Sequence, residues 1–282
     1  MTTTPRQPTR RRFLRLAAAV VLAAHGCAPR PATPGPAPAE EGTMGDARIR
    51  GLELLCGAPL ARMKDFYHRL LGLAVAGEEP GRLTIAAGAT PITFVSADKG
   101  RPFYHFAFNI PENKVRAARD WQKDRSPLLP IPQHLRDPAY PDDVVNYSHW
   151  NAHSVFFLDP AGNVVEYIGR HDLNNARPGG FGSEDVLYAS EIAFVVDDVA
   201  ATAGRLKAAV GVGQYRGASD QFAALGDEHG LLLVMKRGRI LNFDPSTDEK
   251  AARVYRTRAR VRGAKATTHA FGVLPYEVAV EA

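Results

Sequence analysis

One pattern occurs three times along this chain of 282 residues, and a repeat of this kind restricts the fold more than composition does. Each copy opens with a short apolar stretch, passes through a turn, and continues with the spacing of an amphipathic helix. The opening stretches cover residues 52–59, 105–111 and 191–197. Short apolar stretches separated by Gly and Pro follow each helix and are typical of strands. The sequence therefore predicts an α+β protein of repeated βαβββ modules.

The helices are indicated by apolar residues that recur every three or four positions, which matches a 3.6-residue period with one buried face. In the first module these residues are Leu60, Met63, Phe66, Tyr67, Leu70 and Leu71. A second helix is expected over residues 112–124, and a third carries Val199, Ala203, Leu206 and Val210. The later strands are predicted at residues 73–75, 82–86, 91–95, 154–158, 164–168, 222–225 and 231–235.

Two parts of the chain depart from the repeat. Residues 126–147 are rich in Pro and Asp and are predicted to be a long insertion in the second module. Residues 240–268 are polar and basic, which favours a solvated loop or an edge strand, and residues 271–280 are expected to form a closing strand. No aromatic interleaving or known motif accompanies these arginines, so we expect no nucleic-acid partner.

The amino-terminal segment predicts export. Residues 1–26 hold five arginines and no acidic residue, and without them the 35 Lys and Arg of the chain fall to 30, equal to its Asp and Glu. The Arg11-Arg12 pair precedes Phe-Leu and a short apolar run over residues 17–24, far below the roughly 20 residues of a membrane-spanning helix. This arrangement resembles a twin-arginine (Tat) signal peptide, with an ordinary secretory signal or a disordered basic tail as alternatives.

The residues after this signal indicate a processed terminus and a linker. Gly26-Cys27 resembles a bacterial lipobox, in which Cys27 would carry a lipid and attach the protein to a membrane, although ordinary signal peptidase could cut at the same place. Residues 27–45 form a Pro-rich linker, and residues 28–43 within it include no core-forming residues. The expected location is the periplasm or the extracytoplasmic side of a membrane.

Three segments resemble the vicinal oxygen chelate (VOC) superfamily, which includes glyoxalases, extradiol ring-cleaving dioxygenases and bleomycin resistance proteins. They are the strand-to-helix signature in all three copies, the segment that starts at His105, and residues 156–166. The resemblance implies two βαβββ modules paired into a half-closed mixed sheet around a divalent metal. Modules one and two are expected to pair over residues 46–172, and residues 186–282 to hold the third module with a closing strand.

The resemblance also implies the metal ligands. His105 holds the opening-strand ligand position of module two, and Glu166 holds its closing-strand position. A neutral imidazole and a carboxylate suit a divalent metal that keeps open positions for substrate. Fe(II) or Mn(II) is favoured, and Zn or Ni is the alternative.

The other modules depart from the family pattern. Leu52 stands where module one would supply a second His, with Glu53 beside it. In module three Glu191 holds the opening position, whereas Val234 holds the closing one. A third ligand is therefore sought at His153, which opens a strand and would complete a two-His-one-carboxylate triad if it faces inward.

Asn109, Tyr147, Trp150 and Asn151 are candidate substrate-facing residues. The predicted function is that of an exported metalloenzyme, dioxygenase-like or glyoxalase-like, acting on a small molecule with vicinal oxygens. The alternative is a non-catalytic protein that sequesters a small molecule without a complete metal site. Catalytic residues and oligomeric state stay open, with a homodimer as one option.

Overall fold

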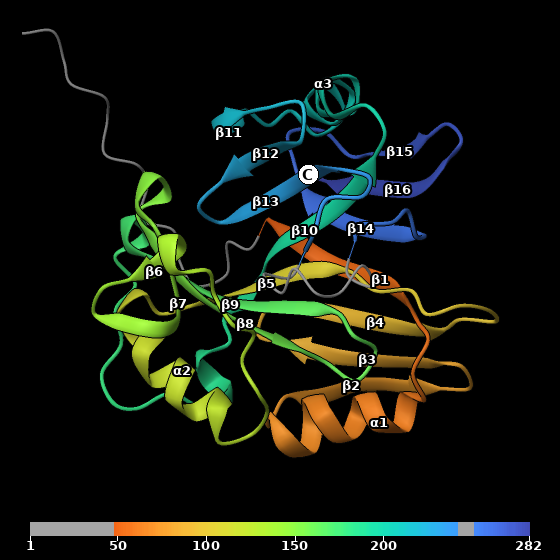
Figure 1. Cartoon of the computed structure of the whole chain (residues 1–282). Helices are drawn as coiled ribbons and strands as arrows, with labels where there is room; N and C mark the ends of the chain where they lie inside the picture. The colour runs from red at the N-terminus through yellow and green to blue at the C-terminus, as the bar shows by residue number, and fades with distance from the viewer. Residues whose placement is uncertain (1–47, 242–250) are drawn as a thin grey trace, which may run out of the picture. The chain divides into compact units, whose positions relative to one another are not determined.

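The protein is described by a computed structural model that covers residues 48–241 and 251–282. The expected signal peptide, the linker and Cys27 lie outside these described residues. The described strands form two mixed sheets with helices packed against them, as Figure 1 shows. The predicted α+β class with mixed sheets is therefore confirmed. No helix in the described ranges is long and apolar enough to cross a membrane.

Sheet one combines module one with the carboxy-terminal residues. Its opening strand pairs in parallel with the closing strand of the same module and antiparallel with a strand near the carboxy terminus. In spatial order its strands are β15 (Thr267–Phe271), β16 (Leu274–Glu281), β14 (Thr257–Arg262), β1 (Ile49–Cys56), β4 (Thr90–Ser96), β3 (Arg82–Ala87) and β2 (Ala74–Glu79).

Sheet two combines modules two and three. Their two opening strands lie antiparallel at its centre, and each is flanked by the parallel closing strand of its own module. In spatial order its strands are β11 (Gln214–Ala218), β12 (Phe222–Asp227), β13 (Gly230–Lys236), β10 (Tyr188–Val196), β5 (His105–Ile110), β9 (Val164–Arg170), β8 (Ala152–Leu158), β7 (Tyr140–Tyr147) and β6 (Arg136–Asp137).

The predicted helices are present, with short 3₁₀ turns between elements. Helix α1 (Leu60–Lys64) continues as the π-helical η1 (Asp65–Leu70), α2 (Val115–Lys123) follows η2 (Glu112–Lys114), and α3 is Val199–Val210. Leu70 is 39% exposed, contrary to its expected place on the apolar stripe. The wider π-helical turns rotate it away from the buried face. The remaining turns are η3 (Gln133–Leu135), η4 (Ser148–Trp150), η5 (His171–Leu173) and η6 (Ser183–Asp185).

The pairing of modules differs from the expectation. Modules one and two lie in different sheets, and module two pairs with module three through β5 and β10. Module one instead pairs with β14, which lies between β1 and β16 and is neither a loop nor an edge strand. The insertion also contributes β6 and the whole of β7 to sheet two. Local sequence patterns define each module, but they do not say which two opening strands pair with each other. The pairing of modules therefore could not be predicted from them.

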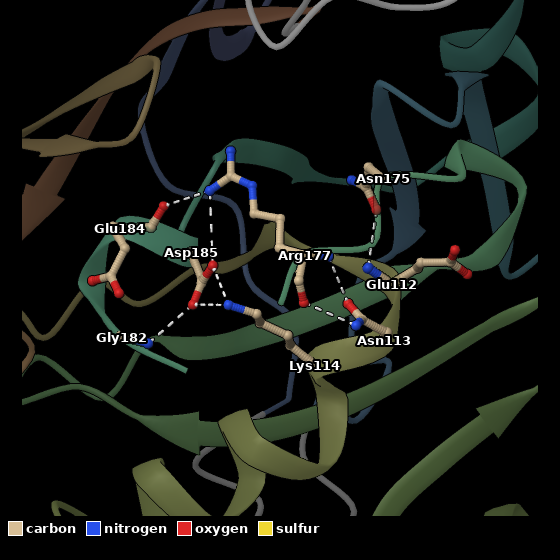
Figure 2. A network of polar contacts seen from close by, with 8 residues as sticks. All are labelled: Glu112, Asn113, Lys114, Asn175, Arg177, Gly182, Glu184 and Asp185. Atoms are coloured by element: carbon tan, nitrogen blue, oxygen red, sulfur yellow. Dashed lines mark hydrogen bonds and ion pairs between the residues drawn. The ribbon is translucent and has the colours of Figure 1, made fainter. Parts of the chain in front are cut away.

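The connection between modules two and three is anchored to module two by polar contacts, which Figure 2 shows. The buried Lys114 ammonium donates to both carboxylate oxygens of Asp185 at 2.8 Å. The Asn113 side-chain amide donates to the Arg177 carbonyl and accepts from the Arg177 backbone N–H, each at 3.0 Å. These contacts hold the connection where it enters β10 and so help to place β10 beside β5.

The two sheets differ in how their faces are covered. The main core contains one face of each sheet, packed with residues of α1, α2 and α3. Along β14 and β16 of sheet one, buried residues alternate with residues that are partly or fully exposed, so the second face of this sheet is open to water. The other face of sheet two is covered by two smaller apolar clusters, so that every residue of β5, β9 and β10 is buried.

Candidate metal centre

Three ionisable side chains from the three central strands of sheet two meet on its second face. They are His105 on β5, Glu166 on β9 and Glu191 on β10, and one ligand atom of each lies within 4.8 Å of the others. Glu166 and Glu191 both lie opposite Ala107, one in each neighbouring strand. His105 is two residues before Ala107, and strand alternation therefore places all three side chains on the same face.

The distances within this cluster, which we call the His-Glu-Glu cluster, are short. His105 Nε2 lies 3.5 Å from Glu166 Oε2 and 3.8 Å from Glu191 Oε2. Side chains that share one metal at about 2.0–2.2 Å from each ligand atom lie at such separations. The small side chain of Ala107 leaves room between the two carboxylates.

The cluster is almost completely removed from water. His105 is 7% exposed, and Glu166 and Glu191 are each 2% exposed. Burial lowers the pKa of His105 to about 4, so the imidazole is neutral. Burial raises the pKa of Glu166 well above its ordinary value, and the charge of Glu191 raises it further. Burial likewise raises the pKa of Glu191, against the opposing effect of Arg170.

Contacts around the cluster orient two of its members. His105 Nδ1 lies 3.0 Å from the Val164 carbonyl oxygen, to which a protonated Nδ1 donates, and this leaves the lone pair of Nε2 directed at the carboxylates. The fully buried Arg170 donates to Glu191 Oε1. Glu191 Oε2 therefore remains on the side of His105.

The residues present fit a divalent cation. Glu166 Oε1 is buried and makes no hydrogen bond of ordinary geometry with the described residues, although the Ser154 hydroxyl lies near enough to lower the pKa of Glu166. With neutral His105, the two carboxyls face one guanidinium, that of Arg170, so ionisation of both would leave one buried negative charge uncompensated. A neutral imidazole held by a backbone carbonyl, together with carboxylate oxygens, is a common donor set for divalent metals.

The structure brings together two of the three ligands expected from the sequence. His105 and Glu166 are in the cluster, but His153 is not. His153 lies opposite Gly169 in the β8–β9 pair, whereas Phe156 lies opposite Glu166. The odd spacing between positions 153 and 156 puts His153 on the opposite face of the sheet.

His153 has a different set of partners. Its Nε2 lies 2.6 Å from Asp137 Oδ2 and its Nδ1 lies 2.7 Å from His171 Nε2. His171 Nδ1 in turn lies 3.1 Å from Glu112 Oε2. This chain of imidazoles and carboxylates ties β6, β8, η5 and η2 together, and we assign His153 to it.

Glu191 is the cluster member that sequence reasoning did not select. Its place at the opening position of module three is recognisable from the sequence. Its partner was expected at the closing position of module three, whereas its actual partners, His105 and Glu166, are in module two. The closing position of module three is Leu233, which lies opposite Ala193, two residues after Glu191. Val234, expected there, belongs to the main core on the other face. Either way module three offers no second carboxylate at this position.

Glu53, and not Leu52, occupies the opening position of module one. Leu52 is packed in the main core, whereas Glu53 points to the opposite face. Glu53 is six residues before Pro59, as His105 is six residues before Pro111. Glu53 lies opposite Arg258 and pairs with Arg82 at 2.6 Å and Arg258 at 3.0 Å.

Two of the four expected substrate-facing residues border the cluster. Burial raises the pKa of Tyr147 well above its ordinary value, and the nearby charges of Glu166 and Glu191 raise it further. Trp150 is 8% exposed and packs on Tyr147, with ring centroids 5.7 Å apart, and on Tyr215 at 5.4 Å. Arg170 lies over the Trp150 ring, 5.7 Å from its centroid. Aromatic rings therefore form one wall beside the cluster.

The other two expected residues are occupied elsewhere. Asn109 is on the same face as His105, but it is fully buried and donates to the Tyr188 hydroxyl at 3.2 Å. Asn151 is exposed, has a positive φ of 47° and donates to Asp172 at 2.7 Å. A left-handed conformation is accepted more readily by Asn than by most residues, so Asn151 serves the turn before β8.

The comparisons with known proteins concern the fold. No protein-family model matches the sequence, and no curated protein sequence matches it. A candidate dioxygenase from Bacillus subtilis is similar in structure, with a TM-score of 0.53, 16% identity, and coverage of 85% of this chain and 86% of that protein. Glyoxalase I from Zea mays matches with a TM-score of 0.42, 16% identity, and 67% of each chain. The first likeness, with the observed sheet topology, confirms the glyoxalase/VOC-type fold.

Proposed function

We propose that this chain is an exported metalloenzyme that holds one divalent metal through His105, Glu166 and Glu191 and acts on a small molecule with two adjacent oxygens. The observation that carries the proposal is the buried His-Glu-Glu cluster, in which Glu166 Oε1 makes no hydrogen bond of ordinary geometry with the described residues. A buried carboxylate without compensation is unfavourable, and a cation would remove that penalty.

The donor set supports a choice of metal. The sequence suggested two imidazoles and one carboxylate, whereas the cluster offers one imidazole and two carboxylates. A larger share of oxygen donors suits Mn(II) and Fe(II) better than Zn or Ni, which bind nitrogen more readily. We therefore propose Mn(II) or Fe(II), with Zn or Ni as the less suitable occupants.

The surrounding residues have defined roles in this proposal. When bound, the metal would supply Lewis acidity and a template for two oxygens of the substrate. The Val164 carbonyl keeps His105 in the tautomer with a free Nε2. Arg170 holds one oxygen of Glu191 and leaves the other for ligation. Tyr147, whose raised pKa keeps its phenol protonated, is placed to donate a hydrogen bond to a bound oxygen.

The reaction class is proposed from the fold neighbour and the donor set together. The similar protein from Bacillus subtilis is described as a candidate dioxygenase, which supports a ring-cleaving, dioxygenase-like reaction. A glyoxalase-like isomerisation is the second candidate within the same fold. The aromatic wall of Tyr147 and Trp150 beside the cluster favours an aromatic substrate and hence the first of these.

A non-catalytic binding protein is the competing proposal. The Arg170–Glu191 pair already compensates one carboxylate, and apolar side chains cover the second face of sheet two. In that case Glu166 would stay protonated, as its raised pKa allows, and the cluster would need no metal. The two proposals differ in one measurable property, the metal content.

The decisive experiment measures metal in the purified mature protein by mass spectrometry after anaerobic loading with Fe(II) or Mn(II). Wild type is compared with His105→Ala, Glu166→Gln and Glu191→Gln, and with Glu53→Gln as the matched control from the equivalent position of sheet one. We expect about one metal per chain in wild type and Glu53→Gln, and little in the other three. Loaded wild type without metal would contradict the metalloenzyme and favour the binding protein.

Export is proposed from residues 1–26, which lie outside the described residues. We expect Arg11→Lys/Arg12→Lys to retain the precursor inside the cell if the twin-arginine pathway is used, since that pathway reads the arginine pair. Cell fractionation followed by mass spectrometry of the mature amino terminus would show both the compartment and whether Cys27 carries a lipid. Normal export of the double variant would contradict the twin-arginine assignment.

A further inference from the structure

A second hollow of the molecule lies away from the His-Glu-Glu cluster and is lined by three arginines. It has a volume of about 450 Å³. Its lining comes from the start of α1, the segment before β5, the turn between β8 and β9, and the segment before β14. We call it the arginine pocket, after Arg62, Arg101 and Arg253.

Within residues 48–241 and 251–282, the three guanidinium groups have no compensating partner. None of the three makes a side-chain hydrogen bond or ion pair with the described residues, and all three are exposed. Asp159, the acid at the edge of the lining turn, is bonded inward: it accepts from the Tyr67 hydroxyl at 2.8 Å and from the Ala161 N–H at 2.9 Å. Two other exposed arginines do have acidic partners, since Arg237 pairs with Asp197 and Arg216 with Asp172. Three positive charges without a partner among the described residues give this hollow a positive potential.

The backbone holds one arginine in place through a close approach. A Cβ at Gly57 would lie 3.0 Å from both the Arg101 Cα and the Gly100 carbonyl oxygen. A side chain at position 57 would push this backbone away by a few tenths of an ångström, so Gly57 favours the close approach of the segment before β5 to the end of β1. This contact fixes the base of Arg101 at the pocket.

The remaining walls are aromatic or small. Phe103 and Tyr255 line the pocket and pack edge to face, with centroids 5.8 Å apart. These two residues and Arg253 also line a much smaller hollow, of about 10 Å³, that includes His105. The pocket thus adjoins the side of β5 that carries the cluster.

From these observations we propose that the arginine pocket binds a small organic anion, with its carboxylate or phosphate group held by Arg62, Arg101 and Arg253 and its apolar body against Phe103 and Tyr255. Guanidinium groups bind the oxygens of carboxylates and phosphates through charge-assisted hydrogen bonds. The aromatic rings supply the apolar contact that inorganic anions cannot use. This proposal goes beyond the metal centre and does not depend on it.

The test is calorimetric titration of the whole mature protein at low salt with benzoate, phenyl phosphate, inorganic phosphate and the neutral control benzyl alcohol. We expect one saturable site for benzoate and phenyl phosphate, weaker binding of inorganic phosphate and none of benzyl alcohol. Arg101→Gln and Arg253→Gln should each weaken binding about tenfold, since each removes a hydrogen bond to a charged group. The matched control is Arg116→Gln, an exposed arginine of α2 outside the pocket, which should leave the affinity unchanged.

Three results would overturn the proposal. Absence of saturable binding by both organic anions would remove the site, and an equal loss in Arg116→Gln would show unspecific attraction to a basic surface. Binding lost in His105→Ala but retained in Arg101→Gln and Arg253→Gln would place the anion at the cluster instead. That third result would leave the metal centre proposal standing, whereas absent metal with intact anion binding would overturn only the metal centre.

Discussion

Sheet one and sheet two are built from the same module, and both carry a Glu or His at the opening positions of their central strands. In sheet one that residue is Glu53, whose carboxylate pairs with Arg82 and Arg258 on a partly exposed face. In sheet two the residues are His105 and Glu191, buried with Glu166 around a single guanidinium. In sheet one the Glu53 carboxylate is thus paired with arginines of the chain. In sheet two, two carboxyls share one guanidinium, and a bound cation would compensate the second.

The difference shows what separates a structural face from a candidate site in this fold. Glu53 has several cationic neighbours and access to water, so its ionised form costs little free energy. Glu166 is shielded from water by the apolar clusters beside it, and Arg170, its one cationic neighbour among the described residues, is hydrogen-bonded to Glu191. The same backbone geometry can therefore host an ion-pair network or a metal centre, depending on the residues across from the opening strands.

The largest effect is expected from Arg170→Met in metal-free protein. Arg170 is fully buried, and its removal leaves two buried carboxylates without a cation. We expect the free energy of unfolding in urea to fall by about 3–5 kcal/mol. The matched change in sheet one, Arg258→Met, removes a guanidinium that is 48% exposed and should cost about 1 kcal/mol or less. Equal losses in the two variants would contradict the contrast between the sheets.

The second effect is stabilisation by metal. Free Mn(II) at about a hundred times its dissociation constant should raise the free energy of unfolding of wild type by about 2.7 kcal/mol, since it binds the folded state alone. Glu166→Gln should lose this gain, whereas Glu53→Gln should keep it. Urea unfolding with and without chelator measures both. A gain retained in Glu166→Gln would place the metal elsewhere.

The sequence predicted the module, the helices and two members of the cluster because these depend on local spacing. His105 and Glu166 follow from motifs that lie within one module, and Gly57 and Pro59 mark the turn that precedes the first helix. Glu191 was missed because its role depends on β10 pairing with β5, a contact between modules that no local pattern encodes.

The wrong predictions for Leu52 and His153 concern which face of a strand each side chain occupies, and they have a simpler origin. Leu52 was assigned by counting back from the helix residues Phe66 and Tyr67, whereas counting from Pro59 leads to Glu53. A shift of one residue moves a strand side chain to the opposite face. His153 failed for the same reason, since its face depends on the register of β8 against β9.

The third effect is the contribution of Glu166 to the pH dependence of the metal-free protein. Burial raises the pKa of this carboxyl above the ordinary value of 4.5, so the folded state keeps a proton that the unfolded state releases. The contribution of Glu166 to stability should therefore be largest at low pH and fall as pH rises above about 4.5, by about 1.4 kcal/mol for each unit by which the two pKa values differ, whereas His105, whose pKa is lowered to about 4, contributes with the opposite sign. Glu166→Gln should flatten this part of the curve, and an unchanged slope would contradict the assignment.

The smallest effect is expected from Glu53→Gln in sheet one, and its pH dependence should have the opposite sign. Burial raises the pKa of Glu53, but the bond to Arg82 and the charges of Arg82, Arg258 and Arg256 outweigh it and lower the pKa below 4.5. The stabilisation is therefore present above the unfolded pKa and is lost as pH falls through the lower, folded value. At pH 7 we expect the variant to lose about 1 kcal/mol or less, because all three arginines are over a third exposed. In 1 M salt the loss should shrink further, as the exposed pairs are screened. A loss as large as that of Arg170→Met would mean that sheet one depends on its ion pairs as strongly as sheet two depends on its buried guanidinium.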